Sequence, residues 1–323
     1  MRHQLILSSL LAVIMMACDP GENSVPEPPV VYDITLDMGG DGRKNQIFFN
    51  LADTSATNTI DRTAWDLSFE ASAEGWVIFL NTANCSKIYR TETSDFAGVS
   101  AIGQLPVHYD ASSQSPDSTA VGDYRNQMEV YILDRGFDTL GNPLGKVKFM
   151  VLSHSASEYV CRFADLNGDN LRDITIPKDP LRNRVALSLT SNTVVACEPE
   201  TDQWHLLFTR YCDVIYSPVW DLETHYGVSG VLINRNYVAV AVDTSHTFDE
   251  IDIALAAQQA YGDAADVIGY NWKFFDGQDY TIDFNRNFVL RDADQRYFKL
   301  RFLDFVNADR QSGYPRFEMV ELY

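Results

Sequence analysis

The second half of this chain repeats motifs of the first half in the same order. Trp-Asp-Leu-Ser-Phe at 65–69 returns as Trp-His-Leu-Leu-Phe at 204–208, and one insertion between Phe208 and Gly230 accounts for a later change in spacing. The other matches are Ile47, Phe49 and Leu51 with Val185, Leu187 and Leu189, then 77–81 with 230–234, and 146–149 with 299–302. Such ordered matches predict an internal repeat of one architecture.

The boundary between the repeats is expected near 177–182, where Pro-Lys-Asp-Pro interrupts regular structure. The first β repeat then covers 31–180 and the second covers 181–323. A chain of 323 residues is long enough for two domains of ordinary size. The repeated Trp residues are expected to fill the core.

Within each repeat the pattern is mostly that of β-strands. Short segments such as 185–189, 237–242 and 297–302 are apolar or alternating, rich in branched and aromatic residues, and separated by turn residues. One segment, 247–261, has helical character, with Thr247 and Glu250 placed as a capping box. We therefore predict a mostly β fold of antiparallel sheets in two related halves, with one or two short helices.

The N-terminus is expected to be a targeting segment. A short positive region precedes an apolar run up to residue 17, typical of a signal peptide 1–17. The run ends in Met-Met-Ala before Cys18, which resembles a bacterial lipobox with Met where Leu is usual. Cys18 is then the lipidated first residue, and the Pro-rich and acidic stretch 18–30 is a tether. The alternative is an ordinary signal peptide followed by a chance Cys.

Charge and motif content limit the function. The chain has 45 acidic and 25 basic residues and a formal charge of −20, so nucleic acid is a poor partner. No phosphate-binding loop, nucleophile elbow or dinucleotide fingerprint is present. A hydrophobic content of 46% supports a globular body. We expect a binding protein rather than an enzyme, attached to a membrane by its lipid alone.

One loop carries oxygen ligands at calcium-like spacing. Asp165, Asn167, Asp169 and Asp173 occupy positions one, three, five and nine of such a loop. The usual Gly at position six and acid at position twelve are missing, and Asn-Gly at 167–168 is itself a turn signal. A calcium site and a plain hairpin are the two interpretations.

Four cysteines follow Cys18, namely Cys85, Cys161, Cys197 and Cys212. An extracytoplasmic compartment permits disulfides, and four cysteines allow three pairings. Buried free thiols are the alternative for Cys161 and Cys197, which flank strand-like segments.

Several segments resemble the HmuY family of surface lipoproteins from Bacteroidota. They are 65–69, 117–122 and 130–136 in the first repeat, and 204–211, 226–234, 268–275 and 297–305 in the second. The chain is similar to the longer, two-part members. One departure is His205, where Asp commonly follows the Trp.

The resemblance implies an antiparallel β fold, a lipid-anchored position on the outer membrane surface, and haem capture with transfer to a TonB-dependent outer-membrane receptor. Two axial side chains hold the iron in such proteins. The family His that follows the Trp-x-x-Phe segment has no counterpart after 272–275, where Asp276 and Gly277 stand. His225 and His246, outside the obvious core strands, are the substitute haem ligands, and surface or capping roles are the alternative for both.

Because the usual ligands are missing, a second function class stays open. A non-haem surface module that binds a glycan or a partner protein would use the same fold, and the 12% aromatic content suits sugar stacking. A structural role within an outer-membrane receptor complex is a third interpretation.

Overall fold

The computed structural model describes residues 29–217 and 221–323. The expected signal peptide 1–17, the lipidation site Cys18 and nearly all of the tether 18–30 lie outside the described residues. Within the described ranges no helix is long and apolar enough to cross a membrane.

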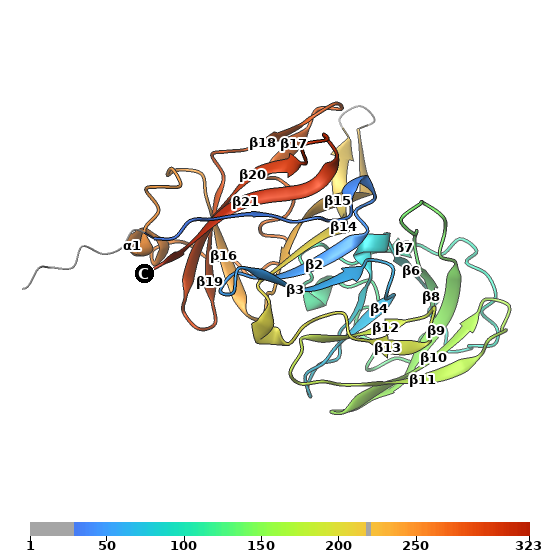
Figure 1. Ribbon diagram of the computed structural model, residues 1–323. Helices are drawn as coiled ribbons and strands as arrows, with labels where there is room; N and C mark the ends of the chain where they lie inside the picture. Colours follow the sequence, from blue (N-terminus) through green and yellow to red (C-terminus); the bar gives the residue numbers. More distant parts are fainter. Residues whose placement is uncertain (1–28, 218–220) are drawn as a thin grey trace, which may run out of the picture.

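The chain forms two β lobes, seen at upper left and lower right in Figure 1. The terminal lobe comprises residues 29–61 and 206–323, so the first and last strands of the described residues pair in it. Its five-stranded sheet has the order β1-β21-β20-β19-β16, its four-stranded sheet the order β15-β14-β2-β3, and a small hairpin pairs β17 with β18. Their bounds are β1 Tyr32–Thr35, β2 Asn45–Asn50, β3 Ser55–Asp61, β14 Leu206–Ser217, β15 Leu222–Ile233, β16 Val238–Asp243, β17 Lys273–Phe275, β18 Tyr280–Ile282, β19 Asn287–Asp292, β20 Tyr297–Val306 and β21 Ser312–Leu322.

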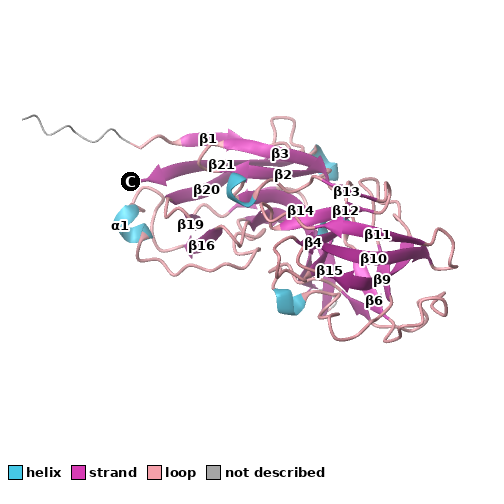
Figure 2. Ribbon diagram, turned by 90° about the horizontal axis from the view of Figure 1, so that it is seen from below, coloured by secondary structure: helices cyan, strands magenta, loops and turns pink. Residues whose placement is uncertain are grey.

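The middle lobe comprises residues 67–195 (Figure 2). Its six-stranded sheet has the order β11-β10-β9-β8-β6-β7 and its four-stranded sheet the order β13-β12-β4-β5. The strands are β4 Leu67–Glu70, β5 Ile78–Leu80, β6 Lys87–Arg90, β7 Val107–His108, β8 Tyr131–Asp134, β9 Lys146–His154, β10 Glu158–Asp165, β11 Arg172–Pro177, β12 Arg184–Ser188 and β13 Thr193–Val195. All named strand pairs are antiparallel, which confirms the predicted fold class.

Each lobe has its own hydrophobic core, built from alternating residues of its strands. The terminal-lobe core joins Ile47 and Phe49 of β2 to Phe208 of β14 and Phe317 of β21. The middle-lobe core joins Phe69 of β4 to Val185 and Leu187 of β12, among others. Since β2 pairs with β14 and β12 pairs with β4, each predicted half contributes an early strand to the lobe that the other half mainly forms. The repeat boundary at 180/181 stays a prediction about sequence, because the lobes divide the chain elsewhere.

Helical structure is short. The single α-helix of the described residues, α1, spans only Ile253–Ala256, and η1 Gly40–Gly42, η2 Thr82–Asn84, η3 Pro116–Ser118 and η4 Thr201–Gln203 are 3-10 turns. The predicted helix over 247–261 is therefore wrong in length. The Lys299 ammonium binds the backbone carbonyls of Phe248 and Ile251, and the Asp252 side chain accepts the N–H of Leu255. These hydrogen bonds occupy backbone carbonyl and N–H groups that a longer helix would use for its own internal hydrogen bonds.

A disulfide and hydrogen bonds connect the two lobes. A disulfide joins Cys85, after η2 of the middle lobe, to Cys212 of β14, with 5.4 Å between the Cα atoms. Beside it, Arg210 of β14 donates to the carbonyl of Ala83 at 2.9 Å. Of the three pairings that the sequence allowed, this one leaves Cys161 and Cys197 as buried free thiols.

Candidate functional site

A cleft in the terminal lobe collects positive charge in an otherwise acidic protein. It encloses about 1310 Å³ of empty space, its open mouth included. We call it the basic cleft; it is lined by Asp41, Gly42, Arg43, Arg210, Ile215, Tyr226, Gly227, Val228, Ser229, Tyr270, Asn271, Lys273, Phe274, Phe275 and Tyr280. The walls come from the turn before β2, from β14 and β15, and from the β17–β18 hairpin.

Three cations and one carboxylate face this cleft. Arg43 lies 3.5 Å from Asp41, and its guanidinium also donates to the Ser312 hydroxyl at 2.6 Å. Arg210 and Lys273 form no ion pair with the described residues. The cleft therefore has positive charge available for an anionic group.

Lys273 is the most perturbed of these cations. Its ammonium donates to the carbonyl of Ser229 and lies 4.2 Å from the centroid of the Trp272 ring and 4.5 Å from that of Phe305. Burial in this aromatic setting, followed by repulsion from Arg43, lowers the pKa of Lys273 to about 7. An anion bound in the cleft would stabilise the charged ammonium and raise the pKa of Lys273 again.

The same cleft presents aromatic surface to solvent. Tyr226 is 62% exposed, Phe274 67% and Phe275 51%, although large apolar side chains are usually covered. Phe274 and Phe275 belong to β17, which pairs with β18, and both residues line the cleft. Flat apolar surface beside unpaired cations suits a planar ligand that carries negative groups.

The two predicted haem ligands lie in different surroundings. His225 is on β15, where it stacks on Tyr109 of the middle lobe with 3.6 Å between ring centroids. Desolvation in this stack lowers its pKa. His225 is not among the residues that line the basic cleft, although its neighbour Tyr226 is. His246 follows β16, and its Nδ1 lies 2.9 Å from the Asp243 carboxylate.

Of the predicted calcium residues, Asn167 and Asp169 lie in the turn between β10 and β11, whereas Asp165 ends β10 and Asp173 belongs to β11. Asn167 donates to the Asp169 carboxylate at 2.8 Å, and Asp165 accepts a side-chain bond from Asn170. Asp173 instead pairs with Arg162 on the neighbouring strand at 2.7 Å. No group of three or more metal-ligating side chains gathers anywhere in the described residues. The calcium site stays a prediction without a ligand cluster behind it.

The cationic residues of the cleft were missed at the level of sequence. Arg43 and Arg210 are separated from Lys273 by long stretches of chain, so no local pattern brings them together. One signal was available, because Lys273 and both Phe residues belong to the 268–275 segment that carries the family resemblance.

Comparison with known proteins gives a family but no close relative. The HmuY protein family matches residues 42–319. No curated protein matches the chain. Among solved structures, the apo HmuY analogue TFO of Tannerella forsythia is 9% identical, with a TM-score of 0.27, and the match covers 92% of this chain and 98% of that one.

Two further structures are similarly distant. Apo PinO from Porphyromonas gingivitis is 8% identical with a TM-score of 0.29, covering 92% of this chain and 99% of that one. The BF2707 protein of Bacteroides fragilis is 12% identical with a TM-score of 0.23, covering 91% and 90%. Because the family match takes in nearly all of both lobes, the chain belongs to the HmuY family.

Proposed function

We propose that this protein captures haem, or a closely related planar anion, at the cell surface and delivers it to a TonB-dependent outer-membrane receptor. The single observation that carries the proposal is the basic cleft, where Lys273 and Arg210 lie beside the exposed rings of Tyr226, Phe274 and Phe275. A porphyrin offers an apolar plane to the rings and two carboxylates to the cations.

Membership of the HmuY family supports the proposal, since the exposed β17 segment of the cleft is part of the family match. The iron ligands are a separate question. The predicted axial residues His225 and His246 do not line the basic cleft, whereas Tyr226 does, and its phenolic oxygen is a ligand type that ferric haem accepts. We therefore propose Tyr226 as the axial ligand in the cleft, with the two histidines as the alternatives.

The primary test is a haemin titration of residues 31–323 followed by absorbance. We expect a saturable Soret shift whose affinity falls at least tenfold in the double variant Phe274→Ala/Phe275→Ala. The matched control is Phe284→Ala, which removes an equally exposed ring outside the cleft lining. An absorbance change that does not saturate, or an equal loss of haemin affinity in the double variant and in Phe284→Ala, would contradict haem binding in the cleft.

The ligand assignment needs its own series. His225→Ala, His246→Ala and Tyr226→Phe are compared by the low-spin and charge-transfer bands of the ferric complex. The axial residue is the one whose replacement changes these bands. Unchanged bands in all three variants would reject all three residues as axial ligands.

We also propose that Cys18 is lipidated and holds the protein on the outer surface of the outer membrane. Replacing Cys18 with Ala should move the protein from the membrane fraction to the soluble fraction. Protease added to whole cells should digest the wild-type protein if it faces outward. Retention of the Cys18→Ala variant in the membrane fraction would refute the anchor.

A further inference from the structure

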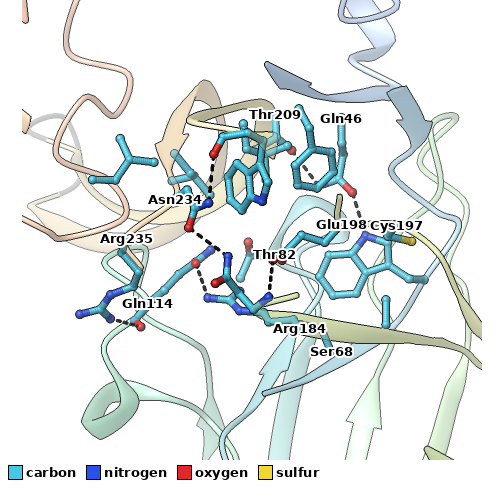
Figure 3. A pocket seen from close by; sticks show the side chains of 18 of the residues that line it. Gln46, Ser68, Thr82, Gln114, Arg184, Cys197, Glu198, Thr209, Asn234 and Arg235 are labelled. Atoms are coloured by element: carbon cyan, nitrogen blue, oxygen red, sulfur yellow. Dashed lines mark hydrogen bonds between the residues drawn. The ribbon is translucent and has the colours of Figure 1, made fainter. Parts of the chain in front are cut away.

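A second pocket lies between the two lobes and shares only Arg210 with the lining of the basic cleft. Both repeated Trp residues, Trp65 and Trp204, line this pocket. Figure 3 shows Arg184 and Ser68 on one side of this inter-lobe pocket and Gln46 and Thr209 on the other. The first two belong to strands of the middle lobe and the last two to strands of the terminal lobe.

The pocket wall holds hydrogen-bonding capacity that the protein does not use. Trp65 donates its indole N–H to Gln46 at 2.8 Å. The indole nitrogen of Trp204 and the hydroxyl of Ser68 have no partner among the described residues, although these residues are only 5% and 4% exposed. Buried polar groups are nearly always paired, so two unpaired groups among the lining residues indicate a missing partner.

Three cations, Arg184, Arg210 and Arg235, and one carboxyl group, Glu198, line the pocket. Arg184 and Glu198 attract each other, and Arg184 also donates to Gln114 at 2.6 Å. Arg235 faces Asp263, outside the lining, at 3.6 Å. Burial raises the pKa of Glu198 to about 7 against the opposing effect of Arg184, so this carboxyl can donate as well as accept near neutral pH. Arg210 is thus the lining cation without a carboxyl partner among the described residues.

The pocket is held open by contacts between the lobes. Thr82 lines it and begins η2, which leads to the Cys85–Cys212 disulfide. On the opposite side, Asn183 and Asn234, also lining residues, bond to each other at 2.9 Å. A preformed site loses little conformational freedom when a ligand binds.

We propose that the inter-lobe pocket binds a neutral sugar residue, as a free monosaccharide or as the end of a glycan. Sugar hydroxyls both donate and accept, which matches the amide, carboxyl and guanidinium groups that converge there. The half-buried Trp65 ring offers an apolar surface to the C–H face of a pyranose, while Ser68 and Trp204 supply the unused hydrogen bonds.

The test is saturation-transfer NMR on residues 31–323 with the methyl glycosides of glucose, galactose, mannose and N-acetylglucosamine, followed by titration. We expect saturable binding of at least one glycoside. Trp65→Ala and Glu198→Gln should each weaken it at least tenfold, with folding checked by circular dichroism. Asn236→Ala, an exposed lining residue, serves as a further variant should either of the others fail to fold.

Two controls separate this site from the haem proposal. Phe274→Ala/Phe275→Ala should leave glycoside binding unchanged, and Glu198→Gln should leave the haemin titration unchanged. Absence of saturable binding by all four glycosides up to about 50 mM would overturn the proposal. Binding that none of the pocket variants weakens would overturn it equally.

Discussion

Asn81 and Asn234 make the same pair of side-chain hydrogen bonds in the two lobes. Asn81 donates to the carbonyls of Arg62 and Trp65 at 2.6 and 2.7 Å. Asn234 donates to those of Thr201 and Trp204 at 2.7 and 3.0 Å. In both cases the two acceptor residues are three positions apart, and the second one is the repeated Trp. These matching contacts support the predicted internal repeat.

Replacing either asparagine should destabilise the protein. Both side chains are buried, and alanine would leave two carbonyls without a donor, at a cost of about 2–3 kcal/mol. Urea denaturation of Asn81→Ala and Asn234→Ala checks this value. The control is Asn285→Ala, an exposed position expected to change the unfolding free energy by less than about 0.5 kcal/mol. Equal midpoints for all three variants would contradict the assigned role.

The Asp-to-His difference between the repeats has a structural explanation. Asp66 accepts the N–H of Leu189 at 2.7 Å and pairs with Arg135. In the second repeat, His205 Nδ1 accepts the N–H of Leu51 at 3.2 Å, so Nε2 carries the proton and faces Asp292 at 3.4 Å. The His205 imidazole thus accepts a backbone N–H, as the Asp66 carboxylate does. The carboxylate near the imidazole is that of Asp292, on β19.

His205 should make stability depend on pH. Burial lowers its pKa against the opposing effect of Asp292, so the unfolded chain binds a proton more readily. Stability is therefore complete above the ordinary histidine pKa near 6.5 and falls as the pH drops below it, by up to about 1.4 kcal/mol per pH unit. Unfolding free energies between pH 7 and 5 should fall less steeply for His205→Asn. Parallel curves for the two proteins would contradict this assignment.

Sequence patterns predicted the fold class and many of the strands, because alternation is a local property, and the equivalence of the two Trp motifs stays a prediction. They did not predict that β2 pairs with β14 and β12 with β4, since both pairings join segments far apart in the chain. The basic cleft was missed for the same reason. The predicted helix was too long because Lys299, on a distant strand, takes two of its carbonyls.

The disulfide should stabilise the arrangement of the lobes. Cys85 and Cys212 are 127 residues apart, and the loss of a native crosslink over a long loop costs about 2–5 kcal/mol. Cys85→Ser/Cys212→Ser should unfold at a correspondingly lower urea concentration. Reductant should lower the wild-type midpoint to that of the double variant and leave the double variant unchanged. A further loss in the reduced double variant would point to another crosslink.

The second repeat alone should not fold. A fragment of residues 181–323 lacks β1, β2 and β3, which complete both main sheets of the terminal lobe, and it retains β12, whose partner β4 is absent. We expect a broad, non-cooperative thermal transition and poor dispersion in its NMR spectrum. Residues 29–61 added in trans should restore cooperative unfolding to a fragment of residues 200–323. A cooperatively folded 181–323 would make the repeat an independent domain.

Lys273 should make haemin affinity fall as the pH rises. Its pKa near 7 means that the free protein loses the positive charge as the pH rises from 6 to 8.5. A bound carboxylate raises that pKa, so binding takes up a proton and weakens by up to about tenfold per pH unit above 7. Lys273→Arg keeps its charge throughout, and its affinity should stay high and level. Lys273→Gln never carries the charge, and its affinity should be low and level. Haemin titrations at four pH values distinguish these curves, and a wild-type curve parallel to that of Lys273→Gln would exclude Lys273 from the site.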